Sequence, residues 1–163
     1  MTRVSKKSPG ATHALRQEKP SAPSVEGTAD ALLRAALEAC RQHERVGRLL
    51  DKGSADDELR GSAALCELAD RQLAERTATY EAVAAGGKGT ASDDFWRAAN
   101  TLWHASREYA RRHHSCDSLS TTLSKHSSDK LGELAMEYEL EASSLLALRQ
   151  AIAAYRKVRP KAE

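Results

Sequence analysis

Aromatic residues are scarce in this sequence. The 163 residues include one Phe, two Trp and four Tyr, so large rings cannot supply most of a core. Alanine and leucine dominate instead, and both are strong helix formers. A chain of this length buries a single core. The composition therefore predicts one all-α domain whose core is built from small and aliphatic side chains.

Long hydrophobic runs are also missing. No segment approaches the roughly 18 consecutive apolar residues of a membrane span, and the N-terminus lacks the apolar stretch of a secretory signal. Three widely spaced cysteines form no even-numbered disulfide framework, which fits a reducing compartment. We therefore expect a cytoplasmic protein that does not cross a membrane.

A strong charge of one sign is absent as well. The chain has 25 basic and 23 acidic residues, for a formal net charge of +2. So weak a field disfavours nucleic acid or anionic lipid as a partner. Basic residues and three of the four prolines concentrate in residues 1–27. This segment is predicted to be a disordered basic tail, which either contacts an acidic partner, serves as a targeting signal or only solubilises the chain.

The remaining sequence shows helical periodicity. Apolar residues recur at helical spacing between turn signals at Gly53 and Gly86, and Thr28, Ser54 and Ser92 are predicted N-caps. The predicted helices span residues 29–52, 55–85, 93–125 and 129–158. Short connections favour antiparallel neighbours, so we expect an up-down-up-down four-helix bundle with long, coiled-coil-like helices. Fusion of the last two helices is the alternative.

Apolar residues on the last two helices follow seven-residue lines. Such lines are typical of a helix that packs along its length. The line on the third helix is Phe95, Leu102, Tyr109, Cys116 and Leu123. The line on the fourth helix is Leu131, Tyr138, Leu145 and Ile152. Both lines are predicted to face the core.

Cysteine and histidine residues gather at one level of the predicted bundle. Residues equally far from a shared turn lie at the same height in antiparallel helices. This arithmetic places in one layer, beside Glu141, the residues Cys40, His43, Cys66, His113 and Cys116. Thiolate and imidazole are ligands of tetrahedral zinc, so the layer predicts a zinc site, and no other cofactor is expected. The alternatives are core packing of small cysteines, a reactive or redox thiol, and a His43 hydrogen-bonded to Glu141 or a tyrosine.

Familiar catalytic patterns are missing. No Glu is followed by a His three residues later, as di-iron bundles require, and no nucleophile turn is present. We therefore expect a non-enzymatic interaction or regulatory module that forms a homo-oligomer, with a metal- or redox-responsive bundle as the alternative. Tryptophan and arginine are common at interface hot spots. The predicted partner-binding residues are Trp96, Trp103, Arg107 and Arg111.

Overall fold

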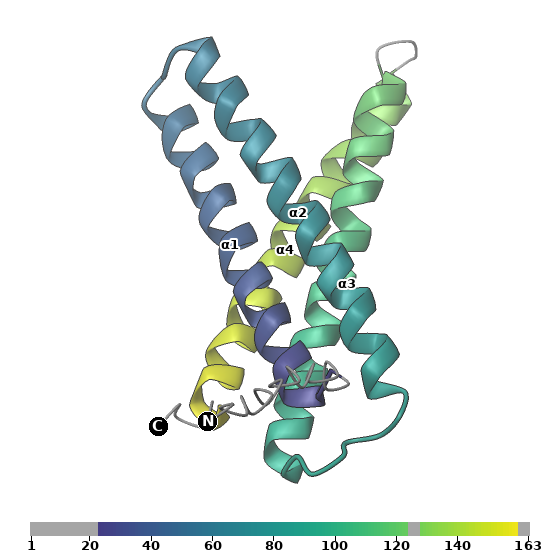
Figure 1. The fold of residues 1–163 in the computed structure, drawn as a ribbon. Helices are drawn as coiled ribbons and strands as arrows, with labels where there is room; N and C mark the ends of the chain where they lie inside the picture. Colours follow the sequence, from purple (N-terminus) through teal and green to yellow (C-terminus); the bar gives the residue numbers. More distant parts are fainter. Residues whose placement is uncertain (1–22, 124–127, 160–163) are drawn as a thin grey trace, which may run out of the picture.

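Four antiparallel helices make up the fold (Figure 1). The computed structural model describes residues 23–123 and 128–159. The helices are α1 (Val25–Asp51), α2 (Asp56–Ala84), α3 (Asp93–Leu123) and α4 (Ser128–Val158). The predicted all-α up-down bundle is confirmed. Because α3 and α4 are separate helices that pack against each other, the fused-helix alternative is wrong.

Two of the predicted helix boundaries follow the expected chemistry. Gly53 ends the first helical segment with a φ of 63°, a left-handed conformation that glycine adopts without a steric penalty. The Ser92 hydroxyl accepts a hydrogen bond from the backbone N–H of Phe95 at 3.3 Å. Ser92 therefore caps α3 as predicted.

The predicted starts of the first two helices need correction. α1 begins one turn earlier than expected, because Ser24 is its N-cap and accepts from the Gly27 N–H at 3.0 Å. Thr28 lies inside the helix, where its hydroxyl donates to the Ser24 carbonyl at 3.0 Å. The N-cap of α2 is Ala55, without a side-chain hydrogen bond, rather than Ser54. Neighbouring serine and threonine residues have similar capping chemistry, so spacing alone did not select among them.

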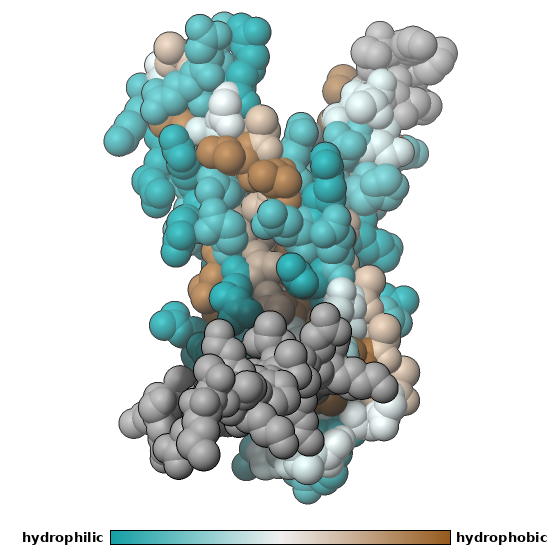
Figure 2. Space-filling model, viewed as in Figure 1, coloured by the Kyte–Doolittle hydropathy of each residue, from teal (hydrophilic) through white to brown (hydrophobic). Residues whose placement is uncertain are grey.

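The helices form two hairpins that diverge like the arms of a V (Figure 1). α1 packs mainly against α2, and α3 packs mainly against α4. The hairpins meet along the half of the molecule that contains the start of α1 and the end of α4, and they part toward the other end (Figures 1 and 2). The fully buried residues of α1 accordingly end at Cys40, and Leu50 is 61% exposed. We call the level at which the hairpins part the fork.

The fork explains why one predicted core line is buried as far as Cys116 and the other is only half right; the burial of Leu123, the last residue of the first line, lies outside what the structure describes. On α3, Phe95, Leu102, Tyr109 and Cys116 are each at most 3% exposed. On α4, Ile152 is buried, but Leu131 and Tyr138 are 61% and 50% exposed. These two residues lie beyond the fork, where α3 is the main neighbour of α4. Their predicted burial was therefore wrong.

The apolar core lies entirely on the closed side of the fork. Its largest fully buried side chains are Tyr80, Tyr109, Tyr155, Leu32, Leu73, Leu102 and Leu148. The Tyr155 hydroxyl donates to Asp30 at 3.0 Å, and Arg159 pairs with the same carboxylate at 2.8 Å. These bonds tie the end of α4 to the start of α1. The opposite boundary of the core is formed by polar residues at the fork.

Two sequence predictions fall partly beyond the described residues. Most of the predicted basic tail, residues 1–22, lies outside them, whereas residues 25–27 belong to α1. The predicted turn between the last two helices lies outside them at residues 126 and 127. Among the helices that are described, none has the length and apolar character needed to cross a bilayer.

Candidate metal centre

Asp70 is the centre of a polar cluster at the fork. Its side chain, on α2, is 8% exposed. One carboxylate oxygen, Oδ2, lies 3.0 Å from His43 Nε2, 3.3 Å from His113 Nε2 and 3.9 Å from the Cys66 thiol. The other, Oδ1, accepts a hydrogen bond from the Tyr109 hydroxyl at 3.1 Å. Groups from α1, α2 and α3 thus converge on one buried carboxylate.

Helix geometry brings these groups together. Cys66 and Asp70 are four residues apart, as are Tyr109 and His113, so each pair lies on one face of its helix. His43 follows the last buried residues of α1 and contacts both Asp70 and the Tyr109 hydroxyl. A buried carboxylate is costly unless it is hydrogen-bonded or paired. The surrounding donors offset that cost.

α4 contributes Glu141 to the cluster. Its Oε1 lies 2.7 Å from His113 Nδ1, so the two ring nitrogens of His113 face carboxylates on different hairpins. The hydrogen bond to Glu141 raises the pKa of His113 above its ordinary value. Burial pushes the pKa of Glu141 upward, but hydrogen bonds from His113 and Cys116 outweigh burial and hold that pKa below its ordinary value.

The thiols at the fork are held in the protonated form in the absence of metal. Burial and the nearby Asp70 charge raise the pKa of Cys66 to about 12. Burial and a hydrogen bond to Glu141 raise the pKa of Cys116 to about 12. A thiol of this pKa has almost no thiolate at neutral pH, and thiolate is the reactive form.

The structure brings together part of the predicted Cys and His layer. Single ligand atoms of His43, Cys66 and Asp70 all lie within 4.8 Å of one another, so this buried group is able to hold a metal ion. His113 joins the group through Asp70. Cys116 lies beside Glu141 instead.

Cys40 is separate from this group. It is buried in the apolar core beside Arg149 of α4. Burial raises the pKa of Cys40, and Arg149 opposes that rise in part. Cys40 is therefore not part of the group formed by His43, Cys66 and Asp70, although the prediction placed it in the same layer.

Asp70 was missed by the sequence analysis. The available signal was a single acid on the apolar face of α2, one turn after Cys66 and one residue before the solvent-facing Arg71. A lone carboxylate at such a position requires partners when it is buried. The hydroxyl of Tyr109, which was predicted as a core residue, contacts His43 and is therefore the tyrosine partner expected for that histidine; its hydrogen bond to Asp70 was not predicted.

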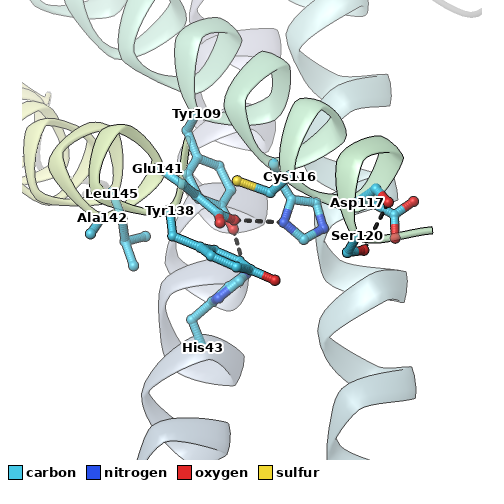
Figure 3. A pocket seen from close by; sticks show the side chains of 10 residues that line it. His43, Tyr109, Cys116, Asp117, Ser120, Tyr138, Glu141, Ala142 and Leu145 are labelled. Carbon is cyan, nitrogen blue, oxygen red and sulfur yellow. Dashed lines mark hydrogen bonds and ion pairs between the residues drawn. The ribbon is translucent and has the colours of Figure 1, made fainter. Parts of the chain in front are cut away.

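Two cavities reach the cluster from different sides. One, of about 400 Å³, is lined by residues of α1, α3 and α4. Figure 3 shows the side chains of His43, Tyr109, Cys116, Tyr138 and Glu141 converging around it. The other, of about 600 Å³, lies among α1, α2 and α3. Both cavities are lined by His43 and His113.

Comparison with known proteins gives no independent guide to this site. No family model, curated protein or solved structure matches the chain. Its chemistry must therefore be derived from its own donor atoms. Those atoms are imidazole nitrogen, carboxylate oxygen and thiol sulfur, which together can exchange protons or ligate a metal ion.

The predicted partner-binding residues lie away from the cluster and contact other parts of the chain. Trp96 and Trp103 are half-buried and pack against the core. The guanidinium of Arg107 lies 5.5 Å from the centre of the Trp103 ring. Arg111 forms an ion pair with Glu108 at 2.7 Å. Their role in binding a partner stays a prediction.

Proposed function

We propose that the protein binds a divalent transition-metal ion, with zinc the best match, at the fork between its two hairpins. The observation that carries this proposal is the convergence of His43, Cys66 and Asp70, whose ligand atoms lie within 4.8 Å of one another. His113, from the other hairpin, supplies a further nitrogen beside Asp70. A bound ion would therefore cross-link the two hairpins.

The donor set favours zinc over harder cations. Magnesium and calcium prefer oxygen ligands, whereas zinc accepts nitrogen, oxygen and sulfur together. Cys66 supplies sulfur, and His43 and His113 supply nitrogen. Asp70 then serves as the single carboxylate ligand.

The separations of the donor atoms from Asp70 Oδ2 are close to those of a tetrahedral site. With zinc bonds of about 2.0–2.3 Å, two tetrahedral ligand atoms lie about 3.3–3.8 Å apart. From Asp70 Oδ2, the distances to His43 Nε2, His113 Nε2 and Cys66 Sγ are 3.0, 3.3 and 3.9 Å. In the metal-free protein, His43, His113 and Cys66 contact Asp70 through hydrogen atoms on their nitrogen and sulfur atoms. An ion replacing the protons would need only small side-chain movements.

Glu141 has the position of a supporting carboxylate. Histidine ligands of metals commonly donate their second ring N–H to a carboxylate, which fixes the ring and increases its basicity. His113 presents Nε2 toward Asp70 while Nδ1 contacts Glu141 at 2.7 Å. The Glu141 contact would thus orient His113 for metal binding.

The thiol chemistry favours a metal ligand over a redox pair. Redox-active cysteines have lowered pKa values, whereas burial raises the pKa of both Cys66 and Cys116 to about 12. A metal ion lowers the pKa of a thiol that it coordinates and removes its proton. Cys66 would therefore become a thiolate only when an ion is bound.

The test is native mass spectrometry and elemental analysis of untagged protein purified without chelator. We expect one zinc ion per chain, and a higher melting temperature on addition of zinc to metal-free protein, because a ligand that binds only the folded state stabilises it. Cobalt is a second probe: an absorption band from thiolate-to-cobalt charge transfer would report Cys66.

Matched variants separate the proposed site from general effects on folding. Asp70→Asn and Cys66→Ser should lose the metal, and Glu141→Gln should weaken zinc binding by about 10- to 100-fold. Cys40→Ser, which changes a buried cysteine outside the site, should retain it. A metal-free protein whose melting temperature does not respond to zinc would contradict the proposal. The residues predicted to bind a partner, Trp96, Trp103, Arg107 and Arg111, lie on α3 and are not part of this site.

A further inference from the structure

α4 has an unusual amount of exposed apolar surface. Nine large hydrophobic side chains are exposed in the described part of the chain, and six of them belong to this helix: Leu131, Met136, Tyr138, Leu140, Leu146 and Val158. α4 already buries one face, with Leu148, Ile152 and Tyr155, in the core. A helix that is apolar on both faces is normally covered on both. Something other than the core is therefore expected to cover the outer face of α4.

Four of these six residues, Met136, Leu140, Leu146 and Val158, lie on one face of α4 opposite the core, whereas Leu131 and Tyr138 lie more than 100° around the helix from its centre. At 100° per residue, the positions from Gly132 onward that fall within about 60° of a line through Ser143 are all exposed, and so is Ala153 at the edge of this face. We call the exposed residues of this face between positions 136 and 157 the outer stripe: Met136, Glu139, Leu140, Ser143, Leu146, Ala147, Gln150, Ala153, Ala154 and Lys157. Six of these ten are Leu, Met or Ala, so the stripe is mainly apolar and small enough in its second half for another helix to approach closely.

Charges on α4 are distributed asymmetrically along the helix. Glu133 and Glu139 lie exposed in the first half, and Arg156 and Lys157 lie exposed near the end. None of these four forms an ion pair with another described residue, whereas Arg149 pairs with Glu44 of α1. A parallel copy of the helix would place like charges together. An antiparallel copy would place acids beside bases.

We infer that the outer stripe is the contact between two copies of this chain, which pair through antiparallel α4 helices about a two-fold axis. With the axis between Leu146 and Ala147, each Leu146 faces Ala147 of the other copy. Leu140 then faces Ala153, so large residues of one half pack on small residues of the other. A two-fold interface is self-complementary in this way.

The same register satisfies the charges. Glu139 faces Ala154 of the other copy and lies three residues, about 4.5 Å along the axis, from Lys157. Because the axis is two-fold, this pairing occurs twice. The arrangement covers the apolar stripe and pairs both of its charged residues with opposite charges. This complementarity of the stripe with itself favours a second copy of the chain over an unrelated partner.

The experiment is analytical ultracentrifugation of the full chain at several concentrations, with and without chelator. We expect a dimer under both conditions, since the outer stripe and the fork lie on different faces of α4. Leu146→Glu should weaken dimerisation by on the order of 100-fold, because two glutamates would meet at the axis. Circular dichroism should show unchanged helix content, since residue 146 is 57% exposed.

A charge exchange tests the antiparallel register. Glu139→Lys and Lys157→Glu should each weaken the dimer, and the double variant should restore it. Leu65→Glu with Leu68→Glu is the matched control, because it alters exposed leucines on α2 and should leave the dimer intact. A monomeric wild-type chain would overturn the inference. So would a dimer that is unaffected by Leu146→Glu, or one that Leu65→Glu with Leu68→Glu dissociates.

Discussion

Asp70 and His113 belong to different hairpins, yet Oδ2 of one lies 3.3 Å from Nε2 of the other. The contact lies at the fork, where the hairpins begin to part. His43 reaches the same carboxylate from α1, and Glu141 holds His113 from α4. The four helices are thus joined by polar contacts at the boundary of the apolar core. Their arrangement at this point depends on charge as well as on packing.

Replacement of Asp70 should destabilise the metal-free protein. Asp70→Asn keeps the shape of the side chain but removes the charged acceptor that His43, Tyr109 and His113 share. Hydrogen bonds to a buried charge contribute about 1.5–3 kcal/mol each, and the amide preserves some of them. We expect a loss of about 2–3 kcal/mol in the free energy of unfolding. Urea denaturation in the presence of chelator measures it.

Asp57→Asn is the control for that change, because Asp57 lies on the same helix with its side chain 99% exposed. Its effect should stay within about 0.5 kcal/mol. Equal losses for the two variants would mean that Asp70 has no special structural role.

The contribution of His113 to stability should depend on pH. In the folded protein its pKa is raised above 6.5 by Glu141, and that of Glu141 lies below 4.5. A raised pKa stabilises the fold fully below the unfolded value, and the stabilisation disappears as pH rises through the folded value. A lowered carboxyl pKa stabilises above 4.5 and loses its effect as pH falls through the folded value. The charged pair is therefore strongest between these limits.

His113→Gln should accordingly destabilise the metal-free protein more at about pH 5.5 than at about pH 9. Denaturation curves at the two pH values give the difference. His104→Gln, which changes an exposed histidine of the same helix, should show no comparable difference. An identical loss for His113→Gln at both pH values would exclude the charged pair.

Zinc binding should release protons. The metal-free Cys66 thiol has a pKa of about 12, so coordination at neutral pH must displace its proton. We expect the apparent zinc affinity to rise about tenfold per pH unit for each proton released. Calorimetry in buffers of different ionisation enthalpy counts these protons. In Cys66→Ala the count should fall by about one, and an unchanged count would remove Cys66 from the ligand set.

The closed end of the molecule can be tested through Tyr155. Its hydroxyl donates to Asp30 at 3.0 Å from a fully buried ring. Tyr155→Phe keeps the ring and should lower the free energy of unfolding by about 1.5 kcal/mol, since Asp30 retains Arg159. Tyr138→Phe should change it by less than about 0.5 kcal/mol, because Tyr138 is 50% exposed. Thermal and urea denaturation of both variants would decide the point.

Helix number and order were predictable from local chemistry. Gly53 and Ser92 mark their boundaries through backbone conformation and capping, which act over a few residues. The core line through Leu102 and Tyr109 followed from periodicity. These features depend on the helix itself and need no knowledge of its neighbours.

The fork and the centre of the cluster were not predictable in this way. Periodicity assigns Leu131 and Tyr138 to a core, but their burial depends on whether the other hairpin remains close. Counting residues from the shared turn correctly predicted that His43 and Cys66 lie at the same level of the bundle. It could not resolve the rotation that turns Cys40 toward Arg149 and brings Asp70 inward. Rotations of this kind are set by tertiary packing of all four helices.

The order in which the molecule folds follows from the position of the cluster between the hairpins. Each hairpin joins helices that are adjacent in sequence, and such local structure forms rapidly. The contact between His43 and Asp70 lies within the first hairpin. The contacts of His113 and Tyr109 with Asp70 require the second hairpin to be in place. We therefore expect the burial of Asp70 to be completed when the two hairpins dock. A slow phase detected near Tyr109, after helix formation, would measure that docking step.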